Sequence, residues 1–149
     1  PMNLKKFLKY LLYLFPWFIS VIFVKIDSNY YQELTLPFFA PPKILFPIIW
    51  TILYILISIA IYQTLKKANS NYKIYLLINY LANQLYTTCF FIFKNNLLSL
   101  TDCLITLLSS MYLYLEVKDI NKKSSTYLIP YIIWNLYATI LSLSILLLN

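Results

Sequence analysis

Aromatic and amide side chains recur at helical spacing in this sequence, and together they could bind a large flat molecule. Phe46, Trp50 and Tyr54 are four residues apart, so they lie on one side of a helix. A second row, with spacing 4-3-4, combines two amides with two aromatic rings: Asn79, Asn83, Tyr86 and Phe90. Aromatic walls with a few hydrogen-bonding groups suit a ligand that is mostly apolar.

Two further rows place polar groups inside apolar segments: Ser99, Asp102, Thr106 and Ser109, then Tyr131, Trp134, Ala138 and Ser142. Each row also has a purely structural explanation, because Asn, Ser and Thr side chains commonly form interhelical hydrogen bonds worth about 0.6 kcal/mol each. Asp102 lies near the start of its predicted helix, where it could cap the helix or face the membrane interface instead of a pocket. Three such rows opposite Trp50 and Tyr54 favour a cavity.

The composition excludes several other kinds of site. The chain has no histidine, which excludes a histidine-ligated zinc or haem iron, and we expect no metal site and no required cofactor. Cys89 and Cys103 fall inside apolar runs, where cysteines act as small hydrophobic residues. All twelve basic residues are lysines that flank apolar runs, a pattern that favours membrane topology over nucleic-acid binding.

The composition predicts that this protein lies in a lipid membrane. Of its 149 residues 61% are hydrophobic and only 11% are charged, against about 25% charged in an average soluble domain. We therefore expect an all-α, multi-pass integral membrane protein with one five-helix bundle over residues 1–149. The predicted helices cover residues 7–24, 44–65, 72–93, 97–117 and 126–148, and loop 27–42 lies over the pocket.

Two features refine this topology. The first segment has the lysines and apolar core of a signal peptide but lacks a small-residue cleavage site, so we expect a retained helix, kinked at Pro16. Nine lysines fall on the N-terminal side of the bundle and three (Lys25, Lys43 and Lys94) on the other side. This bias predicts a cytoplasmic N-terminus in a bacterial cell membrane.

These motifs resemble those of the TspO/MBR family, the tryptophan-rich sensory or translocator proteins. The family pattern of two prolines, a phenylalanine and Trp-x-x-x-Tyr appears here as Pro41-Pro42, Phe46 and Trp50 to Tyr54. The family's remaining motifs match in order at these positions: Tyr30-Tyr31, Leu34 and Pro37; Asn79, Asn83, Tyr86-Thr87 and Phe90-Phe91; Asp102; Pro130-Tyr131, Trp134 and Ala138.

The chain also departs from the family pattern. Asn79 replaces a glutamine, Tyr86 a tryptophan, Leu36 a lysine and Ser142 an asparagine. A shorter amide and a phenol keep the character of the pocket but change its size and its hydrogen-bond donors. The sterol-binding consensus of animal members needs a tyrosine and then a basic residue, and neither follows Ser142.

The resemblance implies a five-helix homodimer with a cavity near the first loop that binds protoporphyrin IX or haem as a ligand for sensing or transport. Trp50, Tyr54, Tyr86 and Trp134 would pack around the macrocycle, and Asn79 and Asn83 would hydrogen-bond its polar edge. The remaining ligand-binding candidates are Phe46, Phe90, Asp102 and Ala138, with Pro41, Pro42 and Lys43 at the mouth. We expect Lys25, Lys43 and Lys94 to meet the propionates there.

Two other functions stay open. A light-dependent enzyme could degrade porphyrin, and Trp50 and Trp134 would then be the redox-active residues, because an indole can donate an electron to an excited porphyrin. The protein could instead bind or transport other membrane lipids, such as sterols. The few charged or kinked positions within the predicted helices argue weakly against a pore through one protomer.

Overall fold

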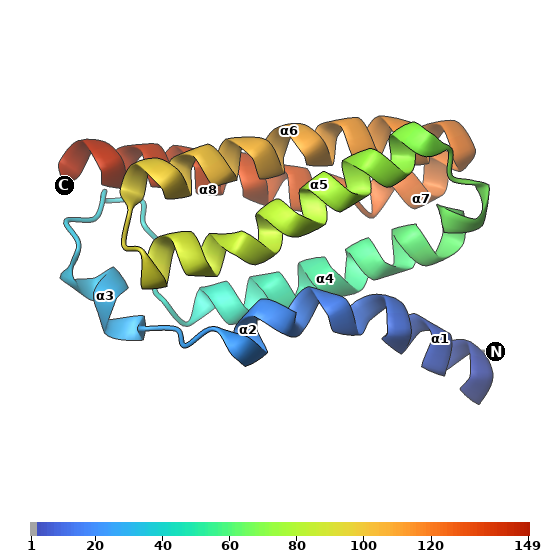
Figure 1. Ribbon diagram of the computed structural model, residues 1–149, viewed down its shortest axis with the longest axis horizontal. Helices are drawn as coiled ribbons and strands as arrows, with labels where there is room; N and C mark the ends of the chain where they lie inside the picture. Colours follow the sequence, from blue (N-terminus) through green and yellow to red (C-terminus); the bar gives the residue numbers. More distant parts are fainter. Residues whose placement is uncertain (1–2) are drawn as a thin grey trace.

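In the computed structural model, which describes residues 3–149, every regular element is helical. The elements in chain order are α1 (Leu4–Leu14), η1 (Phe15–Phe18), α2 (Ile19–Phe23), α3 (Ser28–Glu33), α4 (Leu45–Thr64), η2 (Leu65–Lys67), α5 (Ser70–Thr87), η3 (Thr88–Ile92), α6 (Asn96–Ile120), α7 (Lys122–Thr126) and α8 (Ile129–Leu148). The long helices run roughly along one axis, with α3 at one end of the bundle and α7 at the other (Figure 1).

The first segment is broken where its proline predicts. A 3-10 turn, η1, separates α1 from α2 and has Pro16 in its first positions, because proline cannot donate the backbone hydrogen bond that would continue an α-helix. The segment begins earlier than the expected residue 7, at Leu4, because the Asn3 side chain accepts a hydrogen bond from the backbone N–H of Lys6 and caps the helix.

Asparagine caps also set the starts of three later helices. The side chains of Asn69, Asn95 and Asn121 accept backbone N–H bonds in the first turns of α5, α6 and α7. Helix α6 continues to Ile120, three residues beyond its predicted end. The last predicted helix, residues 126–148, is divided: α7 occupies residues 122–126, and α8 begins only at Ile129, with Pro130 in its first turn.

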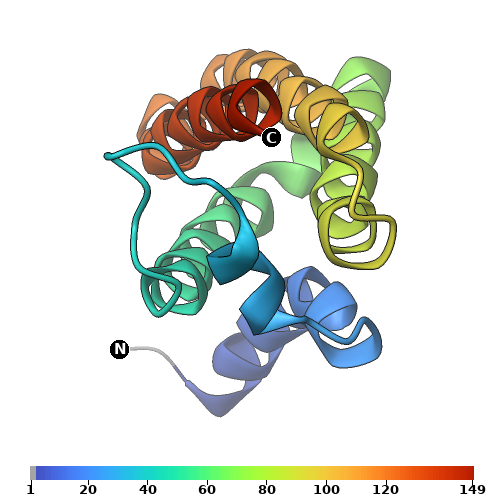
Figure 2. The same ribbon diagram turned by 90° about the vertical axis from the view of Figure 1, so that its left-hand side faces the viewer.

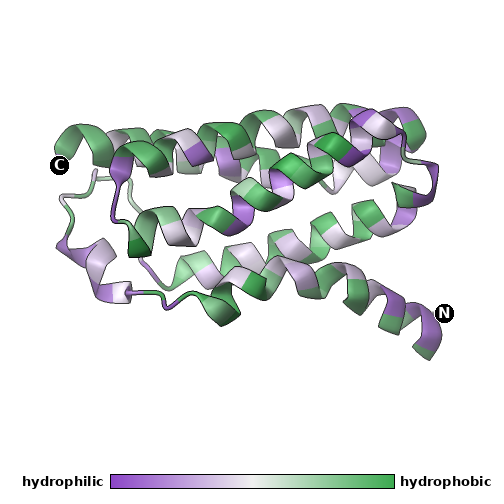
Figure 3. Cartoon of the chain, in the orientation of Figure 1, coloured by the Kyte–Doolittle hydropathy of each residue, from purple (hydrophilic) through white to green (hydrophobic). Residues whose placement is uncertain are grey.

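Four helical stretches are long and apolar enough to cross a membrane: Leu4–Phe23, Leu45–Lys67, Asn96–Ile120 and Lys122–Leu148. Helix α5 is not among them, so the predicted count of five spans is not confirmed. The physical reason lies in its polar side chains, since Asn79, Asn83 and Gln84 lower the mean hydropathy of this helix. The outward-facing residues of all the long helices are mainly apolar, and hydrophilic residues gather at the turns and at the N-terminal end (Figure 3).

The lysines are divided between the two ends of the bundle. The N-terminus, the α4–α5 turn and α7 lie at one end, and α3, the α5–α6 turn and the C-terminus lie at the other (Figure 1). The loop that was expected over residues 27–42 contains α3, which Asp27 caps by accepting hydrogen bonds from the N–H groups of Asn29 and Tyr30. Viewed from this end, α3 crosses in front of the bundle (Figure 2).

Two hydrophobic clusters hold the helices together. The larger one lies toward the lysine-rich end and is centred on buried residues such as Ile57, Tyr72 and Leu113. The smaller one packs α3 onto the bundle through Tyr30 and Tyr31. The cavity described below is lined by members of both clusters.

Candidate functional site

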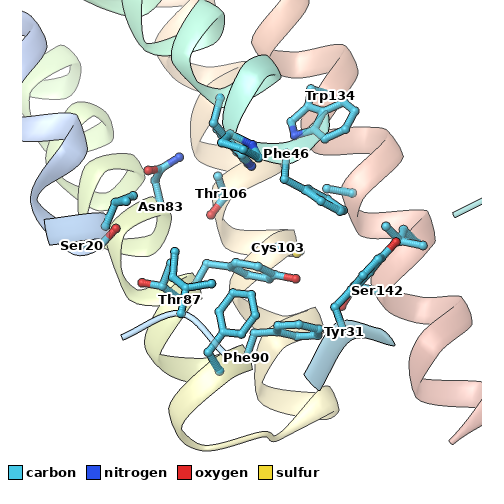
Figure 4. Close-up of a pocket in the computed structure, with 18 of the residues that line it drawn as sticks. Ser20, Tyr31, Phe46, Asn83, Thr87, Phe90, Cys103, Thr106, Trp134 and Ser142 are labelled. Atoms are coloured by element: carbon cyan, nitrogen blue, oxygen red, sulfur yellow. The ribbon is translucent and has the colours of Figure 1, made fainter. Parts of the chain in front are cut away.

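A cavity of about 450 Å³ lies inside the bundle, and helices α2, α3, α4, α5, α6 and α8 all contribute to its wall. Its volume is within the range of pockets that hold drug-sized ligands. Most of the predicted ligand-binding residues line it: Phe46, Trp50, Tyr54, Asn83, Tyr86, Phe90, Asp102, Trp134 and Ala138. Tertiary packing therefore brings four separate sequence rows to one place (Figure 4).

Aromatic rings form two of the cavity walls. On α4 and α8, the ring centroids of Trp50 and Trp134 are 6.4 Å apart with an interplanar angle of 87°, and Trp50 is 5.5 Å from Tyr54. On the opposite wall, Tyr86 and Phe90 are stacked with their centroids 5.6 Å apart and an angle of 10°. Both walls present apolar faces, so a flat ligand between them would contact rings on either side.

A π-helical turn places the second of these walls. At the end of η3 the backbone N–H of Phe93 bonds to the carbonyl of Thr88, five residues earlier, and the next residue, Lys94, has a φ of 48°. Such a turn rotates the residues that follow it relative to an α-helix, and π-turns are frequent at functional sites. Here the turn buries Cys89 and Phe90, and Phe90 lines the cavity.

Asn83 connects the cavity to a buried hydrogen-bond network. Its Oδ1 accepts from the Tyr54 hydroxyl at 3.0 Å and from Gln84 Nε2 at 3.0 Å, and its Nδ2 donates to the Tyr131 hydroxyl at 3.2 Å. Gln84 Nε2 also donates to the carbonyl of Trp17, and Gln84 Oε1 accepts from the N–H of Ser20. Four of the long segments are thus joined through two adjacent amides, Asn83 at the cavity wall and Gln84 beside it.

Asn79 does not line the cavity, contrary to the ligand contact predicted for it. It is fully buried and donates to the Thr106 carbonyl at 3.0 Å and to Ser109 Oγ at 3.1 Å, while its Oδ1 accepts from the Tyr131 hydroxyl at 2.9 Å. All of its hydrogen bonds therefore go to the protein, and Asn79 is a structural residue. Asn79 and Asn83 do lie one turn apart on α5, but only Asn83 lines the cavity, whereas Asn79 bonds to neighbouring helices.

Only one of the three predicted mouth residues, Lys43, lines the cavity. Lys43 lines the cavity and donates to Gln32 Oε1 at 3.4 Å. Pro41 and Pro42 do not line the cavity. The Pro41 carbonyl nevertheless accepts a hydrogen bond from the hydroxyl of Tyr31, which is a lining residue. Lys25 and Lys94, which were also expected to meet propionates at the mouth, do not line the cavity.

Lys94, in the turn before α6, instead contacts the start of α3. Its Nζ lies 3.5 Å from Asp27 Oδ2 and 4.9 Å from the centroid of the Tyr30 ring. Desolvation acts to raise the pKa of the Asp27 carboxyl. The N–H groups of Tyr30 and Asn29 and the Lys94 ammonium outweigh it, so the pKa of Asp27 lies below its ordinary value.

The hydroxyl of Tyr31 is a buried donor at the same end of the cavity. It donates to the Pro41 carbonyl at 2.9 Å, and burial together with the neighbouring Tyr137 raises the pKa of Tyr31 to about 12. The hydroxyl therefore stays protonated and keeps this bond at physiological pH. Tyr137 fixes the same loop through a 2.6 Å bond to the carbonyl of Phe39.

Several lining residues were not predicted as ligand contacts: Phe18, Ser20, Tyr31, Thr87, Cys103, Thr106, Asn135 and Ser142. Phe18 and Ser20 come from the first segment, whose apolar sequence has no polar row to indicate a site. Thr106 and Ser142 belong to predicted polar rows and could have been found there. Asn135 adjoins Trp134 in sequence but lies off the row, so only the packing of α8 against α6 identifies it.

Three buried polar atoms on the cavity wall have no hydrogen-bond partner among residues 3–149: Asp102 Oδ2, Trp134 Nε1 and Asn135 Nδ2. Such atoms are uncommon, because a buried group without a partner costs about 1–3 kcal/mol. Within residues 3–149, no cluster of histidine, cysteine and carboxylate side chains could hold a metal ion. The aromatic rings and the unpartnered polar groups of the cavity can bind a ligand by shape, stacking and hydrogen bonding.

Comparison with known proteins gives a consistent family result. The model of the TspO/MBR family matches residues 10–148. The chain is 31% identical over 132 residues to the tryptophan-rich protein TspO of Bacillus cereus, covering 87% of this chain and 86% of the relative. It is 33% identical over 137 residues to the uncharacterized membrane protein YtaB of Bacillus subtilis (89% and 83%), and 32% identical over 127 residues to the tryptophan-rich protein TspO of Chlorobaculum tepidum (82% and 80%).

Proposed function

Because this chain belongs to the TspO/MBR family of membrane proteins, we propose that it binds tetrapyrroles such as protoporphyrin IX or haem and acts in porphyrin sensing or transport. The observation that carries this proposal is the aromatic cavity. Trp50 and Tyr54 line it from α4, Tyr86 from α5 and Trp134 from α8. Their rings offer a macrocycle stacking surfaces on more than one side.

The charges of the cavity support the same ligand class. Lys43 lies at an exposed position on the lining, and its ammonium, which donates one hydrogen bond to Gln32, has two further N–H groups for a carboxylate such as a propionate. Asn83 and the unpartnered groups of Trp134 and Asn135 offer hydrogen bonds to nitrogen or oxygen atoms of the ligand. A tetrapyrrole combines carboxylates at one edge with a flat, largely apolar ring.

We propose to test binding by titrating the detergent-purified protein with protoporphyrin IX in the dark while following tryptophan fluorescence. The Trp50→Phe/Trp134→Phe variant leaves Trp17 as a reporter, which stacks on Tyr54 with ring centroids 5.7 Å apart. Saturable quenching at micromolar ligand, weakened in the double variant, supports the proposal. Absence of saturable binding contradicts it, and sterols and other lipids are then the ligands to screen.

A light-dependent porphyrin-degrading activity is the second candidate function. Trp50 and Trp134 line the same cavity at 6.4 Å between centroids, so either indole could donate an electron to an excited porphyrin bound there. Illumination of the bound complex should then cause a loss of porphyrin absorbance with a stable product. Loss of this reaction in both single Trp→Phe variants, with binding retained in at least one, would assign it to these residues.

We further propose that α5 is a fifth membrane span. Its outward side chains Ile74, Leu77, Ile78, Leu81 and Leu85 are exposed and apolar, as lipid contact requires. The polar residues that lower its hydropathy point inward, because Asn79 and Asn83 are buried in the network described above. The remaining proposals, a homodimer and a cytoplasmic N-terminus in a bacterial cell membrane, follow from the resemblance and from the lysine distribution.

A further inference from the structure

A groove between α4 and α8 forms a second concave surface, on the outside of the bundle, which the proposed function does not use. It has a volume of about 520 Å³ and is lined by no charged side chain. Ile52 and Ile133 on its lining are 53% and 62% exposed, so the groove is open to its surroundings. The lining residues are Ile49, Ile52 and Leu53 of α4 and Pro130, Ile133, Trp134 and Tyr137 of α8.

The position of this groove suits a lipid acyl chain. Both of its helices belong to stretches that are apolar enough to cross a membrane, and an open apolar surface on such stretches is a site of lipid contact. Its lining on α8, residues 130–137, covers about 10 Å of helix, whereas half of a bilayer's hydrocarbon core is about 15 Å deep. A chain whose head group lies level with α7 therefore reaches along the whole groove.

Helix α7, which precedes α8 in the chain, supplies positive charge at the start of the groove. Its serines Ser124 and Ser125 are buried, and Ser124 Oγ donates to Gln63 Oε1, near the end of α4, at 2.6 Å. Its lysines Lys122 and Lys123 are exposed, and the helix contains no acidic residue. The serines thus pack α7 onto α4, and the two ammonium groups remain outside the packed surface.

Neither of these lysines has a carboxylate partner within residues 3–149. The one ion pair in that part of the chain joins Lys94 to Asp27, at the opposite end of the bundle (Figure 1). A lysine at a membrane surface attracts anionic lipid, with an effect of about fivefold in affinity for each residue. Two free ammonium groups above an apolar groove match the two parts of a phospholipid, a negative head group and an acyl chain.

We propose that one anionic phospholipid, with the chemistry of phosphatidylglycerol, binds here, its head group on Lys122 and Lys123 and an acyl chain in the groove between α4 and α8. This site is distinct from the internal cavity and does not depend on tetrapyrrole binding. Trp134 lines both the groove and the cavity. Its indole therefore contacts the bound chain and reports on its presence.

The test uses the full chain in vesicles, without porphyrin, and lipids brominated on the acyl chain, because bromine quenches an indole that it contacts. Two kinds of vesicle have the same ratio of phosphatidylglycerol to phosphatidylcholine and the same amount of bromine, carried by one lipid or by the other. Brominated phosphatidylglycerol should associate at least about fivefold more strongly than brominated phosphatidylcholine. Trp134→Phe, which keeps Trp17 and Trp50, should lose this head-group dependence.

Two pairs of lysines separate a local site from the overall charge of this end. Lys122→Gln/Lys123→Gln should lower the ratio of the two association constants below about twofold, because it removes the head-group charges and keeps the groove. Lys5→Gln/Lys6→Gln is the matched control and should keep the wild-type ratio. It removes two exposed lysines from the same end, on α1, and α4 lies between α1 and α8 in both views (Figures 1 and 2).

Native mass spectrometry of the detergent-purified protein gives a second readout that needs no fluorescence. Wild-type protein and Lys5→Gln/Lys6→Gln should retain one added phosphatidylglycerol, and Lys122→Gln/Lys123→Gln should lose it. All four lysines are exposed, so neither variant removes a buried contact.

Three results would overturn the proposal. Equal quenching of wild-type protein by the two brominated lipids means that no anionic head group is recognised. A ratio that falls equally in both lysine pairs means attraction to the whole end of the bundle. Absence of Trp134 quenching by either lipid means that another occupant, such as a second copy of the chain, covers the groove. Because porphyrin is absent from every sample, each of these results leaves the proposed tetrapyrrole binding untouched.

Discussion

At the scale of single residues, two asparagines four positions apart on α5 have different tasks. Asn79 forms its hydrogen bonds with Thr106, Ser109 and Tyr131. Asn83 also belongs to the buried network but lines the cavity as well. The Tyr131 hydroxyl joins them, since it donates to Asn79 Oδ1 and accepts from Asn83 Nδ2. This hydroxyl therefore links a residue with a structural role, Asn79, to a residue that lines the cavity, Asn83.

Replacing Tyr131 with phenylalanine should destabilise the protein by about 1 kcal/mol, because the change leaves two buried amide atoms short of a partner. The measurement is the thermal or denaturant midpoint of the detergent-solubilised protein. Tyr112→Phe is the control, as Tyr112 is 52% exposed, and its midpoint should match wild type. Equal midpoints for both variants would mean that the network does not stabilise the bundle.

At the scale of elements, α3 is a short helix held over the end of the bundle by contacts at both of its ends. Asp27 caps it and pairs with Lys94. Tyr31 within α3 and Tyr137 of α8 donate to the carbonyls of Pro41 and Phe39 in the loop that follows. The side chain of Asn149 adds two 3.0 Å bonds to the backbone of Thr35. Because Ser28 and Tyr31 line the cavity, these contacts decide how tightly its end is closed.

Asp27→Ala should increase hydrogen exchange across Ser28–Glu33, because it removes both the cap and the ion pair. Asp27→Asn keeps a cap acceptor and should have a smaller effect, and Glu33→Ala, which removes an exposed acid from the same helix, should have the least. Exchange that is equal in all three variants would contradict this account.

The same ion pair predicts a pH dependence. The pKa of Asp27 is lower in the folded protein than its ordinary value, so its contribution is complete above that ordinary value of about 3.9 and is lost only as the pH falls through the lower folded pKa. Protection of α3, after correction for intrinsic exchange rates, should therefore not change between about pH 5 and 8. A loss of protection within that range would require another titrating group.

Helix α5 supplies a second prediction at this scale. If it spans the membrane, its two ends lie on opposite sides. Cysteines introduced separately as Lys67→Cys and Asn95→Cys should then react with a membrane-impermeant maleimide from opposite faces of sealed vesicles. The native Cys89 and Cys103 are buried, so wild-type protein is the control for background labelling. Labelling of both sites from one face would leave four spans.

At the scale of the whole molecule, charge and hydropathy set the position in the membrane. The exposed lysines of the α4–α5 turn and of α7 lie at the end with the N-terminus, while Lys25, Lys43 and Lys94 lie toward α3 (Figures 1 and 3). Between the ends, the outward side chains are mostly apolar. The proposed orientation, with the N-terminus in the cytoplasm, places the lysine-rich end on the cytoplasmic side.

Trypsin should therefore cleave at Lys66–Lys67 and Lys118–Lys123 in inside-out vesicles but not in right-side-out vesicles. The three lysines toward α3 should show the reverse pattern, as they are exposed at the opposite end. Mass spectrometry of the fragments measures both. Cleavage near Lys43 or Lys94 in inside-out vesicles would mean that the protein has the opposite orientation.

Much of the fold and much of the site could be predicted from the sequence, because both leave local patterns. The apolar runs indicated the long helices, Pro16 indicated the break in the first one, and helical spacing grouped Trp50 with Tyr54. These features depend on residues within a few turns of one another. The helix ends were displaced where asparagine caps or a separate short helix intervened, as at Asn69 and α7.

Only the tertiary structure decided which polar side chains face the cavity. Asn79 and Asn83 share a predicted row, yet Tyr131 of α8 and Ser109 of α6 occupy the space in front of Asn79. Asn135 joins the site because α8 packs beside α6, which no spacing within either helix determines. The sequence determined the helices and their aromatic rows, because periodicity is local; packing between distant segments determined the cavity and the unpartnered groups that line it.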